Sequence, residues 1–85
     1  MKGFVYVLIS KRDNKKYIGS TVDLQRRLCQ HNKGLATSTK YRRPLELLYV
    51  LEYPNIKLAA LMEKKFKRSH DLLLRELESR GIVQR

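Results

Sequence analysis

The sequence predicts a single α+β domain over residues 1–85, in which helices flank a three-stranded antiparallel sheet in the order β-β-α-β-α-α. Three features predict this fold class. Two short apolar runs near the N-terminus are joined by a polar turn, a third apolar run lies between two prolines, and the remaining segments carry apolar residues at helical spacing. A chain of 85 residues buries only about 60% of the surface it exposes when unfolded, so one small core is expected.

The first two apolar runs are predicted to pair as a β-hairpin. Residues 4–9 and 17–18 are rich in β-branched and aromatic side chains, and residues 11–14 between them contain an Asp-Asn turn signal. The third run, over residues 45–53, has the same composition and completes a three-stranded sheet.

The register of the hairpin decides which side chains share a face of the sheet. With Ser10 opposite Lys15 across a four-residue loop, Tyr6 lies opposite Gly19. Tyr17 then lies on the same face as Tyr6, so both phenols are expected on one patch of sheet. Because Gly19 has no side chain, it leaves room there for a substrate or another segment of backbone.

Caps and helix breakers bound the predicted helices. The first helix is expected from a cap at Thr21 or Asp23 to about Asn32, with Gly34 ending it. Residues 35–43 are polar, basic and aperiodic, and are expected to form a loop. The two later helices are expected from a cap at Asn55 to about Lys67, and from Ser69 or Asp71 to Gly81.

The positive charge of the chain indicates a polyanionic partner. The chain has 19 Lys and Arg against 8 Asp and Glu, which gives a net charge of +11 and an isoelectric point near 10.2. Because so strong a field attracts polyanions, nucleic acid is the predicted partner, and the alternative is a surface that is charged only for solubility.

The N-terminus and the single cysteine point to a cytoplasmic protein. The short apolar run after Lys2 is too short for a signal peptide or a membrane span. Cys29 is the only cysteine, which excludes an intramolecular disulfide and fits a reducing compartment. We therefore expect no membrane partner. A monomer is expected.

Helical geometry distinguishes the two adjacent arginines of the first helix. At about 100° per residue, Leu24, Leu28 and His31 fall in one stripe that must face the sheet. Arg27 lies on the flank of this stripe, whereas Arg26 points to the opposite side and is expected in solvent. Arg27 therefore either reaches the sheet with its guanidinium or lays its stem on apolar surface and keeps its charge in water.

A carboxylate lies within the apolar face of the second helix. Ile56, Ala59, Met62 and Phe66 define this face, and Glu63 falls inside the arc, about 40° from Ala59. A carboxylate directed toward a small core needs a cationic partner. The two interpretations are an ion pair with Arg27 or a lysine, and a site for a hard metal ion such as Mg²⁺.

His31 lies one helical turn after Arg27 and is either a hydrogen-bonded core residue or an acid/base group. The sequence contains no glycine-rich phosphate loop, no zinc-binding spacing and no Ser/His/Asp set, which makes zinc chemistry and nucleophilic triads unexpected. No role is predicted for His70.

These residues together resemble the GIY-YIG nuclease superfamily. Tyr6 lies in the run FVYVL, residues 17–19 read YIG, and Arg27 and Glu63 follow on later helices. The first triplet is degenerate, because residues 5–7 read VYV and keep only the tyrosine. The likeness covers about residues 3–75, and the chain looks like the small stand-alone bacterial members of the superfamily, an uncharacterised protein family.

The resemblance implies a divalent-metal-dependent endonuclease that hydrolyses phosphodiester bonds in DNA. Tyr6 would be the general base and Tyr17 would hydrogen-bond the phosphate or the nucleophile. Arg27 would bind the phosphoryl oxygens, Glu63 would hold Mg²⁺ or Mn²⁺, and His31 stands where some members place an accessory acid/base. An arginine and a metal ion each stabilise the charge that phosphodiester hydrolysis develops, by a few kcal/mol.

The chain departs from the superfamily at its C-terminal end. Several superfamily nucleases use an asparagine near the end of the domain, whereas this chain has none after Asn55. Glu63 is therefore expected to hold the metal with waters alone.

Basic residues around the third strand and the second helix are the predicted contacts to a phosphate backbone. They are Lys33, Lys40, Tyr41, Arg42, Arg43, Lys64, Lys65, Lys67 and Arg68. No device for reading bases is visible, so we expect weak sequence preference or preference for a structure such as a flap or nick. DNA is the expected partner rather than RNA. Two alternatives stay open: a non-catalytic nucleic-acid-binding module in which Tyr6, Tyr17 and Tyr41 stack on bases, and a nuclease scaffold that serves as a protein-interaction domain.

Overall fold

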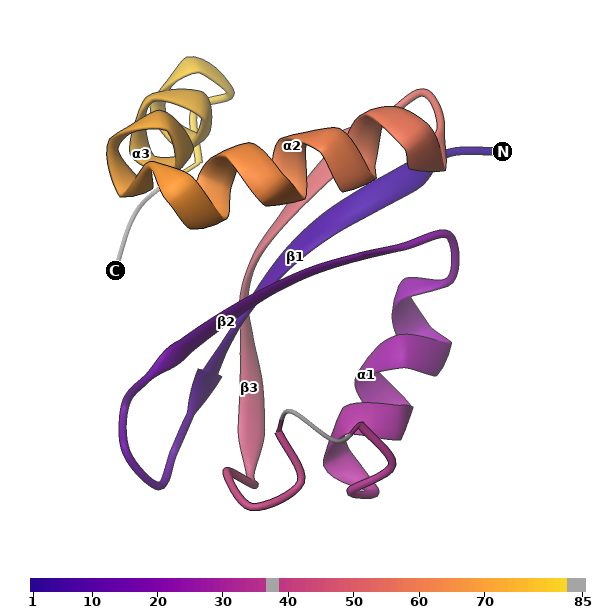
Figure 1. The fold of residues 1–85 in the computed structure, drawn as a ribbon, viewed down its shortest axis with the longest axis vertical. Coiled ribbons are helices and arrows are strands. Elements are labelled where there is room, and N and C mark those ends of the chain that lie inside the picture. Colours follow the sequence, from indigo (N-terminus) through magenta and orange to yellow (C-terminus); the bar gives the residue numbers. More distant parts are fainter. Residues whose placement is uncertain (37–38, 83–85) are drawn as a thin grey trace.

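The predicted order of elements is confirmed in the computed structural model, which describes residues 1–36 and 39–82 (Figure 1). The strands are β1 (Gly3–Ser10), β2 (Lys16–Thr21) and β3 (Leu45–Tyr53). The helices are α1 (Leu24–Asn32), α2 (Ile56–Arg68) and α3 (His70–Ser79). Within the described residues, no helix combines the length and the apolar character that crossing a membrane requires.

The three strands form one antiparallel sheet in the order β2-β1-β3, so β1 is central and β2 is an edge strand. The predicted hairpin register is confirmed, because Tyr6 pairs with Gly19 and Leu8 pairs with Tyr17. The Ser10 N–H donates to the Lys15 carbonyl at 2.9 Å, which closes the turn. This register places the side chains of Tyr6 and Tyr17 on the same face.

Side-chain caps begin each helix and settle the alternatives that the sequence left open. Asp23 caps α1 by accepting the Arg26 N–H at 3.1 Å, and Ser69 caps α3 by accepting the Leu72 N–H at 3.2 Å. Asn55 caps α2 as predicted. After α1, Gly34 has a φ of 79°, a left-handed conformation that glycine adopts without strain.

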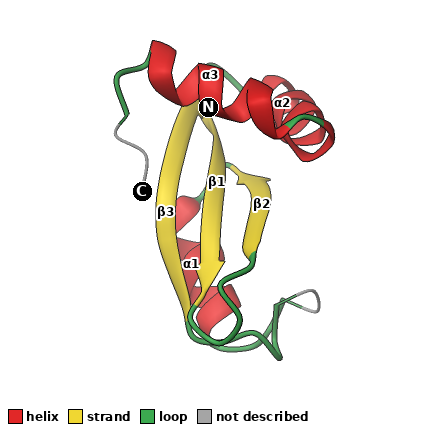
Figure 2. Ribbon diagram, turned by 90° about the vertical axis from the view of Figure 1, so that its left-hand side faces the viewer, coloured by secondary structure: helices red, strands yellow, loops and turns green. Residues whose placement is uncertain are grey.

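The helices cover opposite faces of the sheet (Figure 2). On one face, α1 packs Leu24 and Leu28 against Tyr6 and Leu8. On the other face, α2 and α3 bury a larger cluster, made up of Val5, Val7, Tyr49, Leu51, Tyr53, Ala59, Phe66, Leu73 and Leu77. Ile56 differs from the prediction because it is 37% exposed at the first position of α2, where the helix has only begun to cross the sheet.

Candidate active site

A cavity of about 540 Å³ is lined by the five residues for which the sequence suggests catalytic roles. These residues are Tyr6, Tyr17, Arg27, His31 and Glu63. The two tyrosines, Arg27 and His31 belong to the α1 side of the sheet, whereas Glu63 comes from α2 on the other side. Because β2 is an edge strand, the two groups meet around it, with Gly19 and Ser20 also lining the cavity.

The phenol of Tyr6 lies at the centre of a hydrogen-bonded cluster. The side chain is only 2% exposed, and its oxygen accepts the Nε–H of Arg27 at 3.2 Å. The same oxygen lies 3.1 Å from Nε2 of His31, and the two rings meet edge-on. Two side chains of α1 therefore fix the position of this phenol oxygen.

Gly19 makes room for this phenol. A Cβ atom on Gly19 would lie 2.3 Å from the Tyr6 hydroxyl oxygen, far inside ordinary contact distance. The sequence predicts open space over Gly19 for a substrate or a backbone segment. In the structure the Tyr6 ring occupies it, because the two residues are directly paired across the hairpin.

His31 is buried between Tyr6 and a residue of the following loop. It is 4% exposed, and its Nδ1 lies 2.6 Å from Oγ1 of Thr39, which is fully buried. Burial, and secondarily the positive charge of Arg27, lower the pKa of His31 below its usual value of 6.5, so the imidazole is neutral at pH 7. Thr39 gave no signal in the sequence, because a threonine in a polar loop is unremarkable there.

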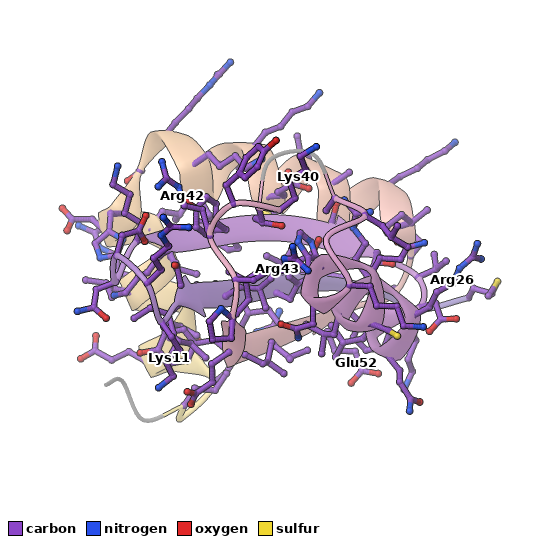
Figure 3. All side chains as sticks on the ribbon, turned by 90° about the horizontal axis from the view of Figure 1, so that it is seen from below. Lys11, Arg26, Lys40, Arg42, Arg43 and Glu52 are labelled. Carbon is purple, nitrogen blue, oxygen red and sulfur yellow. The ribbon has the colours of Figure 1, made fainter. Side chains whose placement is uncertain are left out.

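Arg27 reaches the sheet with its guanidinium, which settles the alternatives for this side chain. Besides the bond to Tyr6, its Nη1 donates to Oε1 of Gln30 at 3.1 Å. Within the part of the chain that the structure describes, these two hydrogen bonds engage two of its five N–H donors. Arg26 points away from this site into solvent (Figure 3).

Glu63 is paired with two donors from the chain. Its Oε1 accepts the Ser20 hydroxyl at 2.5 Å, and its Oε2 accepts the Lys67 ammonium at 2.6 Å. The ion pair that the sequence suggested as one interpretation is therefore present, with Lys67 rather than Arg27 as the partner. Because the Lys67 side chain is 54% exposed, this i,i+4 pair is weak, about 0.5 kcal/mol, and leaves the carboxylate accessible to a competing cation.

The cavity also contains groups to which the sequence analysis gave no role. Lys16, Ser20, Thr39 and His70 line it, and Lys67, predicted as a nucleic-acid contact, lines it as well. Lys16 and Ser20 follow from the confirmed register of β2, because they alternate with Tyr17 and Gly19 and so face α2. His70 lines the cavity from the first position of α3, directly after the helix break that the sequence predicts at Ser69.

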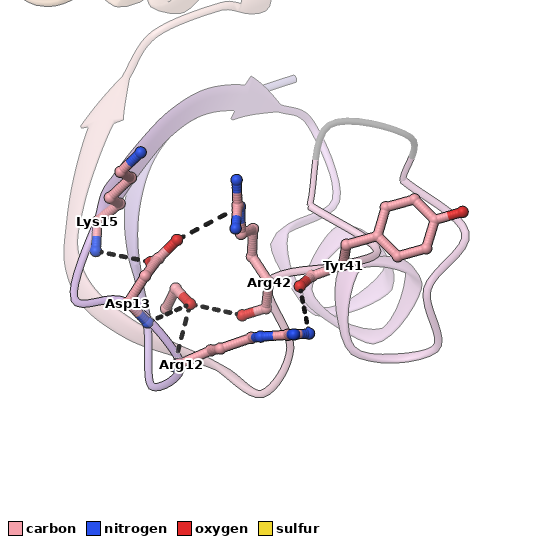
Figure 4. Close-up of polar contacts among 6 residues, drawn as sticks. Arg12, Asp13, Lys15, Tyr41 and Arg42 are labelled. Carbon is pink, nitrogen blue, oxygen red and sulfur yellow. Dashed lines mark hydrogen bonds and ion pairs between the residues drawn. The ribbon is translucent and has the colours of Figure 1, made fainter.

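Four of the nine predicted nucleic-acid contacts, residues 40–43, lie near the turn end of the hairpin. Lys40, Arg42 and Arg43 are found there together with Lys11 of the turn (Figure 3). The loop is fastened to the turn, since Ser10 Oγ donates to the Arg42 carbonyl at 2.6 Å and Arg12 donates to the Tyr41 carbonyl at 3.1 Å (Figure 4). Tyr41 is 70% exposed beside the Lys40 ammonium.

The other predicted contacts are distributed along the helices. Lys33 follows α1 and is exposed, and Lys64, Lys65 and Arg68 are exposed on α2. Lys33 precedes Gly34, which lies close to the Arg43 guanidinium, so Lys33 adjoins residues 40–43. Arg42 also has a carboxylate neighbour, Asp13, at 3.3 Å.

Comparison with known proteins identifies the family. The protein-family model described as the GIY-YIG catalytic domain matches residues 2–73 of this chain. The chain belongs to the GIY-YIG family. This agrees with the resemblance seen in the YIG triplet.

The relatives found are small bacterial GIY-YIG proteins of similar length. A UPF0213 protein of Pediococcus pentosaceus is 36% identical over 84 residues, covering 96% of this chain and 88% of the relative. A UPF0213 protein of Streptococcus pneumoniae is 34% identical over 87 residues, covering 96% and 87%. The solution NMR structure of a UPF0213 protein from Bacillus halodurans is 31% identical, with a TM-score of 0.53, and covers 93% of this chain and 84% of that one.

Proposed function

We propose that this GIY-YIG protein is a divalent-metal-dependent endonuclease that hydrolyses phosphodiester bonds in DNA. Membership of a nuclease family provides the reaction class. The observation that supports the proposal most directly is that two phenols, a guanidinium and a carboxylate line one cavity, although they come from β1, β2, α1 and α2. A phosphodiester placed in this cavity would meet a base, a cationic hydrogen-bond donor and a carboxylate together.

In the proposed reaction, Tyr6 takes the proton of the attacking water. The water oxygen forms a bond to phosphorus, the bond from phosphorus to the leaving sugar oxygen breaks, and solvent supplies the proton of the leaving oxygen. For this step Tyr6 must be ionised, and the Arg27 N–H at 3.2 Å stabilises negative charge on the phenol oxygen. The remaining N–H groups of Arg27 bind the phosphoryl oxygens as charge develops on them, and Tyr17 donates to the same phosphate.

Glu63 fits a loosely held Mg²⁺ or Mn²⁺ ion. Mg²⁺ is commonly bound through one or two carboxylates, with water and substrate phosphate completing its shell, and Glu63 faces the cavity with a 20% exposed side chain. The described residues contain no cluster of three or more His, Cys, Asp or Glu, which argues against a closed protein cage. When bound, the ion would neutralise charge on the phosphate and the leaving oxygen.

Nucleic acid is the proposed partner because of the positive charge of the chain and of the cavity lining. The net charge is +11, and Lys16, Arg27 and Lys67 line the cavity itself. The exposed Tyr41 and the basic loop around it offer a second contact region for a phosphate backbone. DNA of particular structure, such as a flap or nick, is the proposed substrate, since residues 1–36 and 39–82 form no separate base-reading element.

The test is nicking of supercoiled plasmid and of branched DNA, with Mg²⁺ or Mn²⁺ and with chelator. We expect metal-dependent nicking that Glu63→Gln abolishes while DNA binding, measured by fluorescence anisotropy, persists. Glu78→Gln is the matched control, because Glu78 is an exposed carboxylate of α3 outside the cavity lining. Nicking that persists in chelator or in Glu63→Gln would contradict the proposal.

The ion pair between Glu63 and Lys67 favours a second candidate, a non-catalytic nucleic-acid-binding module. In that case the wild type binds DNA without cleaving it, and Glu63→Gln changes stability only. Stacking of bases on Tyr6 is contradicted, because Tyr6 is 2% exposed and its oxygen is hydrogen-bonded to His31 and Arg27. Of the three tyrosines considered, Tyr41 is exposed enough to stack.

A further inference from the structure

Thr39 connects the loop after α1 to the general base proposed above. Its side chain is fully buried, and its Oγ1 lies 2.6 Å from Nδ1 of His31. The other nitrogen of His31 lies 3.1 Å from the Tyr6 oxygen. Thr39 is thus linked to Tyr6 through the side chain of His31.

The backbone around Thr39 is held on both sides. Its N–H donates to the Ala36 carbonyl at 3.2 Å, and its carbonyl accepts the Arg42 N–H at 2.9 Å. The carbonyl of Arg42 in turn accepts the hydroxyl of Ser10, which is fully buried (Figure 4). The hydroxyl of Thr39 is therefore presented to His31 from a fixed backbone.

Counting hydrogens decides which way the bonds run. A neutral imidazole has one N–H, so either Nδ1 or Nε2 carries it. If Nδ1 carried it, the hydroxyl hydrogen of Thr39 would have no acceptor among the described residues, and a buried donor without an acceptor costs stability. If Thr39 donates to Nδ1, Nε2 carries the hydrogen and donates to Tyr6, whose own hydrogen faces the open cavity.

We propose that Thr39 is a positioning residue, which fixes His31 as the Nε2–H tautomer so that the Tyr6 oxygen accepts two N–H donors, one from His31 and one from Arg27. This proposal rests on the proposed nuclease function for its catalytic consequence. With both donors in place, negative charge on the Tyr6 oxygen is stabilised, and its remaining lone pair faces the cavity, where the attacking water would lie. Because Thr39 is fully buried and bonded to His31, it acts on Tyr6 through His31.

The direct test is ¹⁵N NMR of the His31 side chain, which distinguishes the two tautomers without nucleic acid or metal. We expect the Nε2–H tautomer in the wild type and in Thr39→Ser, which keeps the hydroxyl. In Thr39→Val, which has nearly the same shape but no hydroxyl, we expect a mixture with a rising share of Nδ1–H. A wild-type Nδ1–H tautomer would overturn the proposal even if Thr39→Val does not fold, and so would a Thr39→Val tautomer unchanged from wild type.

Kinetics on plasmid DNA give the second readout. We expect Thr39→Val to lower kcat by about 10-fold with little change in KM, and Thr39→Ser to restore it. A loss confined to KM, or a Thr39→Ser variant as slow as Thr39→Val, would overturn the positioning role. Should the wild type fail to cleave any DNA, the nuclease proposal fails, whereas the NMR result still decides the tautomer.

Discussion

Replacing Gly19 by alanine tests whether the position of the Tyr6 phenol controls both stability and chemistry. The added Cβ would lie 2.3 Å from the Tyr6 hydroxyl oxygen and 2.4 Å from its Cζ. To reach ordinary contact the phenol must move by about 1 Å. Tyr6 is 2% exposed and bonded to Arg27 and His31, so moving its ring would disturb both hydrogen bonds.

The expected cost of Gly19→Ala is that of an overpacked core. Such insertions destabilise by about 1–3 kcal/mol, and a 1 Å displacement of a catalytic group lowers the rate by about 10²-fold. The free energy of unfolding is measured by urea denaturation followed by circular dichroism, and the rate by plasmid nicking. Because Gly19 does not have a positive φ, the cost comes from the clash and not from backbone strain.

A double-mutant cycle isolates the clash from other effects. Tyr6→Leu removes the atoms that the new Cβ would meet, so adding Gly19→Ala to Tyr6→Leu is expected to cost little further stability. The control is Gly81→Ala, where a Cβ meets nothing within 4 Å and the cost comes only from the φ of 72°, so Tyr6→Leu should leave that cost unchanged. If Gly19→Ala were neutral in the wild type, or equally costly in both backgrounds, the close approach would not matter and the reasoning would be wrong.

Four further predictions follow from the site and its surroundings. The pKa of His31 is lowered in the folded protein, so the unfolded chain binds a proton at His31 more readily, and the free energy of unfolding should decrease as the pH falls below 6.5. Urea denaturation at several pH values should show this decrease in the wild type and in His70→Gln but not in His31→Gln. The pKa of Asp13 is lowered chiefly by the Lys15 N–H, which adds a separate loss of stability below about pH 3.8 that Asp13→Asn should remove. Arg27→Lys keeps the charge but loses the planar set of donors, so nicking should slow by about 10²-fold while DNA affinity in anisotropy stays near that of the wild type; equal losses in both would instead indicate a purely electrostatic role. Ser20→Ala removes the donor to Oε1 of Glu63, and urea denaturation should show a free energy of unfolding lower by about 1 kcal/mol. An unchanged free energy of unfolding would mean that this hydrogen bond does not stabilise the fold.

Local chemistry explains why so much of the fold was predictable from sequence. Two-residue alternation and a four-residue turn are enough to set the pairing of Tyr6 with Gly19, because a one-residue slip would turn every apolar side chain of the hairpin to the wrong face. Asp23 and Asn55 cap their helices through hydrogen bonds to the residue three positions later, so the short local sequence is enough to predict these caps. Helical periodicity likewise separated Arg27 from Arg26.

Contacts between distant segments explain what the sequence could not reveal. The sequence showed that Glu63 needs a partner, but only the packing of α2 along β2 decided that Ser20 and Lys67 provide it. Thr39 resembles any polar loop residue until the fold of the loop presents its hydroxyl to His31.

The sequence by itself determined the order of elements, the hairpin register and the residue types of the site, because short-range propensities and periodicity fix these. Only the tertiary structure decided that α1 and α2 lie on opposite faces, so that the site forms around the edge of β2 and not over one face of the sheet. The physical reason is that helix placement depends on which apolar surfaces remain to be buried once the sheet has formed, and that is a property of the whole chain.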